Sequence, residues 1–140
     1  MVLIASVSSA QAGPKQDAYR VVEKWGEAFG AADVDGIADL YAPDALMIGT
    51  AGKTVLTTPE QIRNYFEVAL NNGKPRAAKI IGSEALVIDD NTVVITGFDT
   101  ITSTRDGQST AAMGRVTFVV AKRGSAWMIV HLHRSQLPTT

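Results

Sequence analysis

Two histidines and an arginine, His131, His133 and Arg134, lie near the end of the chain in an apolar stretch that begins at Trp127. Apolar and polar residues alternate there, and alternation with a period of two is typical of a β-strand. Because successive side chains of a strand point to opposite faces, we expect Arg134 on the same face as Leu132 and both histidines on the other. A strand with ionisable groups on both faces is expected to meet a ligand or a second subunit.

A second arginine, Arg115, begins the apolar strand that precedes this one, and a turn at 123–125 joins the two strands. Counting back from that turn places Arg115 opposite Arg134, so the two side chains are expected to share a face. Two guanidinium groups in a concave site can bind a carboxylate through bidentate, charge-assisted hydrogen bonds. We therefore predict a small anionic organic ligand, or a carboxylate from the N-terminal helices, between these arginines and beside Trp25 and Tyr41.

The histidines allow two interpretations. Their i, i+2 spacing could place two imidazoles on one metal ion, but the preceding strand, 109–122, contains no Asp, Glu or His that could serve as a third ligand. We therefore predict no metal site. Instead, Trp127, Ile129, His131 and His133 are expected to form one face of the strand and to bury it in a subunit interface of at least a dimer.

Other signs of catalysis are weak. Asp99 is the acidic residue inside the apolar stretch 92–104, where a buried acid would be a candidate general base, but an aspartate paired with another side chain is the preferred interpretation. The chain has neither the Gly-x-Ser-x-Gly motif of serine hydrolases nor a glycine-rich phosphate loop. We predict no catalytic residue and no cofactor.

The composition excludes several classes of protein. The chain has 140 residues, which suits one domain, and 46% of them are hydrophobic. Thirteen basic and fourteen acidic residues give a formal net charge of −1, whereas nucleic-acid binding usually needs a clustered excess of basic residues. Cysteine is absent, which excludes disulfides, thiolate nucleophiles and zinc–thiolate sites.

The N-terminus resembles the end of a secretory signal. Residues 1–12 combine a short apolar run with small residues and finish in Ala10-Gln11-Ala12, as at a signal-peptidase site. The positive segment that usually precedes such a run is missing, and the run is too short to span a bilayer. We expect residues 1–12 to be a signal-peptide remnant and 13–140 to form a periplasmic or secreted domain, or a cytoplasmic one if the run is not cleaved.

Two kinds of periodicity divide this domain. Apolar residues recur every three or four positions over 15–31, 34–41 and 59–70, which predicts three helices, and Leu46–Ile48 is expected to form a short strand. Thr58, Pro59 and Gln61 form the strongest start signal of a helix. From 77 onwards the period is two, which predicts four antiparallel strands over 77–88, 92–104, 109–122 and 126–135. The order indicates an α+β fold, with three N-terminal helices packed in a curved antiparallel sheet.

Several strings resemble the nuclear transport factor 2-like (SnoaL-like) superfamily, which has a cone-shaped, cystatin-like fold. The stretch from Trp127 to Pro138 is similar to W-x-I-V-H-x-H-x-S-x-x-P, the end of the association (hub) domain of calcium/calmodulin-dependent protein kinase II and its bacterial relatives. The segments 40–45 and 58–66 resemble the same group. The resemblance covers about residues 16–138 and implies pocket positions for Arg115 and Arg134, although Ile62 and Phe98 replace a histidine and an arginine of the hub pocket.

The resemblance leaves two functions open. One is a self-associating domain that binds a small anionic ligand, and the alternative is a SnoaL-like isomerase, cyclase or hydratase that uses the same pocket. The segment from Asp33 to Ile37 resembles ketosteroid isomerase, whose mechanism needs a tyrosine and two carboxyl groups. Trp25, Gly49 and Gly114 stand at the corresponding positions, so we do not expect that chemistry and favour ligand binding without catalysis.

Overall fold

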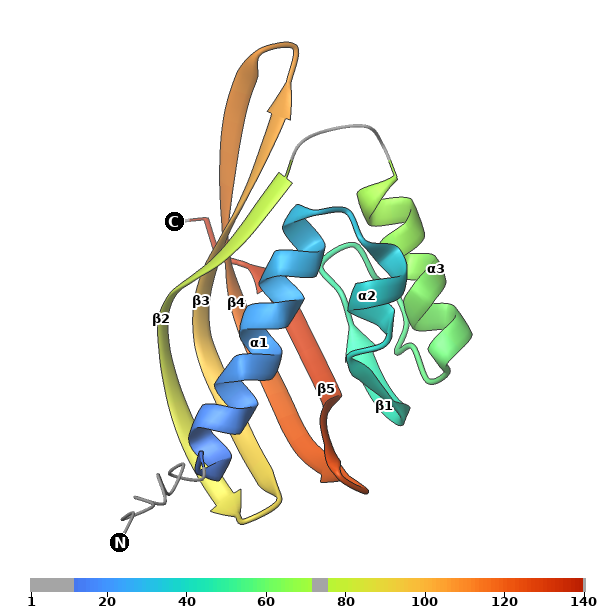
Figure 1. The fold of residues 1–140 in the computed structure, drawn as a ribbon. Helices are drawn as coiled ribbons and strands as arrows, with labels where there is room; N and C mark the ends of the chain where they lie inside the picture. Colours follow the sequence, from blue (N-terminus) through green and yellow to red (C-terminus); the bar gives the residue numbers. More distant parts are fainter. Residues whose placement is uncertain (1–11, 72–75, 140) are drawn as a thin grey trace, which may run out of the picture.

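A computed structural model describes residues 12–71 and 76–139 of the chain. Three helices precede most of the sheet, and the last four strands follow one another in a meander, as the sequence predicts (Figure 1). The elements in chain order are α1 (Pro14–Gly30), α2 (Val34–Ala38), β1 (Tyr41–Ile48), α3 (Pro59–Leu70), β2 (Arg76–Asp89), β3 (Thr92–Arg105), β4 (Gln108–Arg123) and β5 (Ala126–Gln136).

The helices begin where the sequence signals a start. Thr58 accepts a hydrogen bond from the Gln61 backbone N–H, at 3.2 Å, and Pro59 occupies the first turn of α3. Asp33 caps α2 in the same way and accepts from Gly36 N–H at 2.9 Å. These side chains satisfy N–H groups that have no partner inside the helix, which explains why the predicted starts are accurate.

The region after α2 differs from the prediction. The second helix was expected to continue to Tyr41, but it ends at Ala38, and Tyr41 is already the first residue of β1. The short strand predicted at Leu46–Ile48 is the last part of this longer strand. Pro43 can lie inside it because β1 is at the edge of the sheet, where a missing N–H breaks few ladder hydrogen bonds.

The sheet has five strands in the order β1-β5-β4-β3-β2. Strands β2 to β5 pair in antiparallel fashion, as predicted, whereas β1 pairs with β5 in parallel, which corrects the expectation of an entirely antiparallel sheet. Helix α1 lies across the concave face, and α2 and α3 lie beside β1 (Figure 1). In the described part of the chain, all three helices are on this one side of the sheet.

A β-bulge in β5 changes which side chains face the helices. Val120 pairs with Ile129, but the preceding residue, Val119, pairs with His131, so Val130 is an extra residue in the ladder. A bulge of this kind reverses the alternation of the side chains that follow it. The predicted parity from Trp127 to Arg134 therefore fails at Val130.

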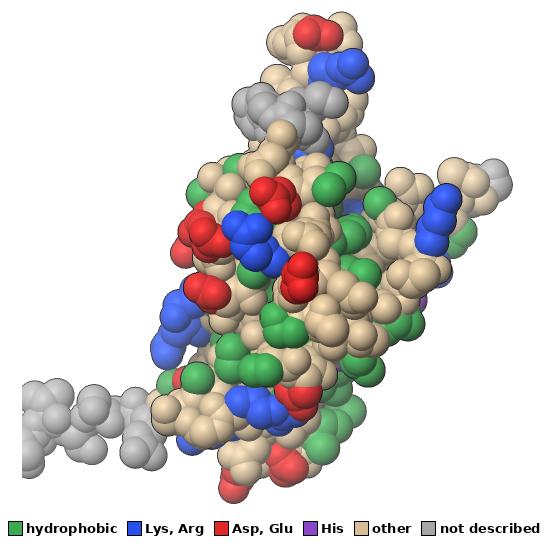
Figure 2. Space-filling model, turned by 90° about the vertical axis from the view of Figure 1, so that its right-hand side faces the viewer, with side chains coloured by type: hydrophobic (Ala, Val, Ile, Leu, Met, Phe, Trp, Pro, Cys, Tyr) green, Lys and Arg blue, Asp and Glu red, His purple; other side chains and the backbone are tan. Residues whose placement is uncertain are grey.

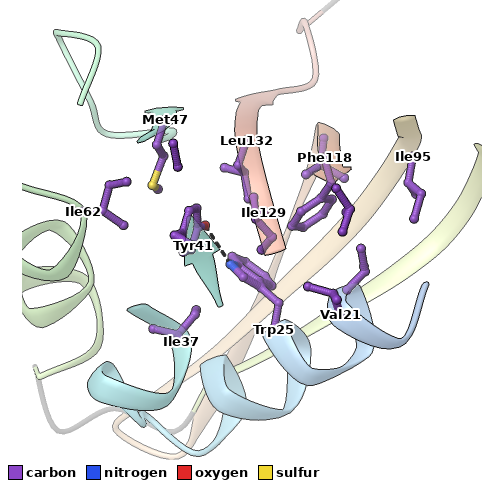
Figure 3. Packing of buried hydrophobic residues seen from close by; sticks show 14 of the residues in the cluster. Val21, Trp25, Ile37, Tyr41, Met47, Ile62, Ile95, Phe118, Ile129 and Leu132 are labelled. Carbon is purple, nitrogen blue, oxygen red and sulfur yellow. Dashed lines mark hydrogen bonds between the residues drawn. The ribbon is translucent and has the colours of Figure 1, made fainter. Parts of the chain in front are cut away.

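The core lies between α1 and the sheet and is built around Trp25. Its indole ring stacks on Phe29, with ring centroids 5.3 Å apart, and meets Phe118 edge-on at 5.5 Å. Ile129 and Leu132 of β5 face the same core, one on each side of the bulge (Figure 3). These contacts hold α1 against the sheet. Cavities can form beyond them, towards the ends of the sheet.

Charges of both signs lie close together on the side formed by α2 and α3 (Figure 2). Arg63 contacts Asp35 at 2.9 Å and Glu67 at 3.0 Å, and all three side chains are largely exposed. Pairs of this kind neutralise one another locally, so this face has no excess of positive charge that would suit a polyanion.

The predicted signal-peptide remnant, 1–12, lies outside the described residues except for Ala12. Export of the domain therefore stays a prediction. Among the described helices, none is both long enough and apolar enough to cross a bilayer.

Candidate functional site

Arg134 and Asp99 form a buried ion pair on the concave side of the sheet. The Nε of Arg134 donates to both oxygens of Asp99, at 2.9 and 2.8 Å, and Nη2 donates to Oδ1 at 2.7 Å. The two residues are only 6% and 1% exposed. The pairing agrees with the preferred interpretation of Asp99 as an aspartate paired with another side chain. The carboxylate beside Arg134 therefore comes from β3, whereas the prediction allowed for one from the N-terminal helices.

The remaining groups around Arg134 hold its guanidinium in place. Nη1 donates to the Thr50 hydroxyl at 2.8 Å, and Nη2 also approaches the Ala112 carbonyl oxygen at 3.4 Å. A side chain at Gly114 would collide with the guanidinium, because a Cβ built there lies 2.5 Å from Nη2. The absence of a side chain at Gly114 is therefore what allows Arg134 to reach Asp99 across β4.

Arg115 does not converge with Arg134, which corrects the predicted arginine pair. Because of the bulge in β5, Arg115 pairs with Ser135, and Arg134 pairs with Val116. Arg115 is exposed on the opposite, convex face, where it borders a shallow depression together with Glu84 and Phe98. A ligand held between the two arginines is therefore excluded.

A cavity of about 460 Å³ lies beside the ion pair, between α1, α3 and the sheet. This volume is within the usual range for pockets that bind small molecules. Its polar groups include Thr50, Arg76, Arg134 and Gln136. Its walls are mostly aromatic or aliphatic and include Trp25, Phe29, Tyr65, Phe66, Ile101 and Leu132.

Arg76 is the functional candidate that the sequence prediction missed. It is the first residue of β2 and borders the cavity. Its Nε is buried without a hydrogen-bond partner, and no ion pair is found for it in the ranges 12–71 and 76–139. An arginine that follows a proline at the start of a strand looks like an ordinary edge residue, so the sequence contains no signal that separates it from other surface arginines.

The two predicted aromatic residues have different positions. Trp25 borders the cavity, but its indole N–H donates to the Tyr41 hydroxyl at 2.9 Å and not to a ligand (Figure 3). Tyr41 is part of the core behind this wall, where burial raises the pKa of its phenol above the ordinary value for tyrosine. Tyr65 of α3 borders the cavity instead, because Gly49 has no Cβ that would overlap the Tyr65 ring.

The predicted interface residues of β5 divide between the two faces. Ile129 is completely buried in the core, and Trp127 packs against that core, so neither belongs to an outer face. His131 and His133 do share the convex face, as predicted. The Nδ1 of His131 lies 3.0 Å from the Leu46 carbonyl oxygen of β1, and His133 is exposed. Within the described ranges, no group of three His, Asp or Glu side chains is arranged to hold a metal ion.

Comparison with known proteins agrees with this architecture. Residues 19–140 match the model of the SnoaL-like domain. The chain belongs to the SnoaL-like family. This SnoaL-like domain is similar to a Xanthomonas campestris structure named for the calcium/calmodulin-dependent protein kinase II association domain. The two are 30% identical, with a TM-score of 0.82, and the match covers 95% of this chain and 97% of that one.

More distant structures share the fold of this SnoaL-like domain. A nuclear transport factor 2-like protein from Salmonella enterica is 24% identical, with a TM-score of 0.78 and coverage of 90% and 92% of the two chains. A Novosphingobium aromaticivorans protein named as an aromatic ring hydroxylase is 19% identical, with a TM-score of 0.77 and coverage of 92% and 94%. No curated protein matches the sequence significantly. The nuclear transport factor 2-like, cystatin-like α+β fold predicted from the sequence is therefore confirmed.

The fold is commonly a ligand-binding or isomerase-type pocket domain, and two features of this SnoaL-like domain bear on whether the cavity beside Arg134 can carry out acid–base chemistry. Both oxygens of Asp99 accept hydrogen bonds from Arg134. Gly49 and Gly114, the positions that the resemblance to ketosteroid isomerase matches to its two carboxyl groups, leave space that Tyr65 and Arg134 occupy. The cavity therefore contains groups that can bind and orient a molecule. Neither Gly49 nor Gly114 places a free carboxylate in it.

Proposed function

We propose that this SnoaL-like domain binds a small anionic organic molecule in the cavity between α1, α3 and the sheet, and that it self-associates. The observation that supports ligand binding is the charge of the cavity. Two guanidinium groups border it, from Arg76 and Arg134, and one carboxylate, from Asp99, balances one of them. Among the described residues, one positive charge is left at this largely apolar cavity, where an anion is attracted more strongly than in water.

Ligand binding is tested with a panel of small organic acids and their neutral amides, measured by thermal shift and confirmed by calorimetry. We expect at least one acid to raise the melting temperature, by an amount that grows with its concentration because the acid binds only the folded state. The effect should weaken as salt is added, since salt screens the charge. If no acid binds more tightly than its amide, the proposed function is wrong.

Self-association is supported by the convex face of the sheet, which the described helices leave uncovered. Leu86, Phe98 and Met113 are 61%, 46% and 46% exposed there. Arg115 and Glu84 lie on the same face, and neither has an ion-pair partner within the described chain. In an interface with twofold symmetry, Arg115 of one copy can meet Glu84 of the other, twice. A second copy of the domain therefore suits this face in both apolar character and charge.

We expect light scattering at micromolar concentration to give at least a dimer mass. Arg115→Glu and Glu84→Arg should each shift the mass towards the monomer, because each places like charges opposite one another. The variant with both changes should restore the dimer. Arg105→Glu, at the tip of the β3–β4 hairpin, is the control and should leave the mass unchanged. A monomeric wild-type protein would contradict self-association, and a dimer that tolerates both single changes would exclude this face.

A further inference from the structure

We infer that Arg76 binds the carboxylate of the ligand, and that the ligand is a monocarboxylic acid with a flat, mostly apolar body of about the size of one ring. This inference rests on the proposed function and makes it more specific. Arg76, on β2, is then the residue that binds the negative charge of the ligand. Arg134 instead helps to form a wall of the cavity.

Arg134 is not available as an anion receptor. Its Nε and Nη2 are committed to Asp99, and its Nη1 donates to Thr50. Five N–H groups are the whole donor capacity of a guanidinium, and a full negative charge already lies against this one. A ligand carboxylate bound at Arg134 would lie close to the carboxylate of Asp99, and two negative charges that are close together repel each other. The ion pair therefore shapes a wall of the cavity without supplying net charge.

Arg76 has the opposite properties. Its Nε is buried and has no hydrogen-bond partner, and no acidic side chain is paired with it in the described ranges. A buried donor without a partner costs about 1–3 kcal/mol, so folded proteins rarely keep one without a reason. A carboxylate could remove this cost and balance the charge once the Arg76 side chain turns its Nε edge towards the cavity, by accepting from Nε and a terminal nitrogen in the bidentate geometry that guanidinium groups favour.

The walls of the cavity indicate the rest of the ligand. Trp25 and Phe66 meet edge to face, with ring centroids 6.1 Å apart, and Tyr65 and Phe66 do so at 5.4 Å. Aromatic walls of this kind pack well against a flat ring. Ile101 and Leu132 complete an apolar lining on the sheet side. A cavity of about 460 Å³ accepts one ring with a short side chain. Among the described residues that line it, Arg76 is the one cation without an acidic partner, so a second negative charge on the ligand would be left unpaired there.

The experiment measures binding of benzoate by calorimetry to the wild-type protein and to Arg76→Met and Arg76→Lys. Arg76→Met should weaken benzoate binding about ten- to a hundredfold, which is the usual effect of losing a charge-assisted hydrogen bond. Arg76→Lys should recover only part of the affinity, because an ammonium group is a point charge without the planar fork. Arg105→Met, on the exposed hairpin tip, removes the same charge and should bind benzoate as the wild type does.

Two further readouts separate recognition from a structural role. Benzamide, which has the ring without the charge, should bind weakly and equally to the wild type and to Arg76→Met, and acetate should bind more weakly than benzoate because it lacks the ring. Without ligand, Arg76→Met should melt at the same temperature as the wild type or higher, since its buried Nε has no protein partner to lose. A structural arginine would lower that temperature.

The possible failures are distinguishable. If benzoate binds the wild type and Arg76→Met with equal affinity, the role of Arg76 is wrong and the proposed function stands. If Arg76→Met loses affinity for benzamide as much as for benzoate, Arg76 shapes the cavity without reading the charge, which also overturns the inference. If no acid binds the wild type at all, the proposed function itself fails.

Discussion

An Asp99→Asn variant is expected to lose about 3–5 kcal/mol of unfolding free energy, because it leaves a buried guanidinium without its counter-charge. Arg134 is 6% exposed, and Asp99 accepts hydrogen bonds from two of its nitrogens. Asparagine keeps the size of the side chain but removes the negative charge. Since domains of this size are usually stable by only 5–15 kcal/mol, the loss is a large fraction of the total free energy of unfolding.

Urea unfolding followed by circular dichroism measures the effect. A matched variant replaces both partners with apolar residues, Asp99→Leu with Arg134→Met, and should regain most of the stability, because it removes both buried charges together. The control is Arg63→Ala, which breaks exposed ion pairs with Asp35 and Glu67 and should change the urea midpoint little. An unchanged midpoint in Asp99→Asn would show that the pair does not stabilise the fold.

Truncation of Trp25 is expected to cost a similar amount, about 3–5 kcal/mol for Trp25→Ala, because the substitution opens a cavity at the centre of the core. Trp25 is 5% exposed and contacts Phe29, Phe66 and Phe118 with its ring. The surrounding side chains relax only partly into a space of this size, so most of the cavity remains. The loss should therefore appear as a lower urea midpoint.

Trp25→Phe separates packing from hydrogen bonding. Phenylalanine keeps an aromatic ring but cannot donate to the Tyr41 hydroxyl, which Trp25 Nε1 contacts at 2.9 Å. The loss of that buried hydrogen bond should cost about 1–3 kcal/mol, so this variant should fall between the wild type and Trp25→Ala. If both variants unfold at the wild-type midpoint, Trp25 is not the centre of the core.

The sequence by itself determined the fold class and most of the elements. The start of α3 is encoded within four residues, Thr58 to Gln61, by a cap and a proline whose effects are local. The alternation of apolar and polar residues that begins after residue 76 predicts the ends of strands β2 to β5 within one or two residues. The fold family was also within reach, because strings such as the one from Trp127 to Pro138 are short, contiguous and similar to those of known members. The end of α2 was missed, since the apolar residues up to Tyr41 fit a helix as well as a strand.

Only the tertiary structure decided the composition of the site. The bulge at Val130 places Arg115 and Arg134 on opposite faces of the sheet, since one extra residue reverses every later side chain. Counting residues back from a turn cannot detect such an insertion, because it depends on how β5 packs against β4 and β1 together. The partner of Arg134 is likewise a residue 35 positions away, Asp99. Arg76 reaches the cavity only because β2 begins beside α1, and contacts between distant segments of this kind leave no local pattern in the sequence.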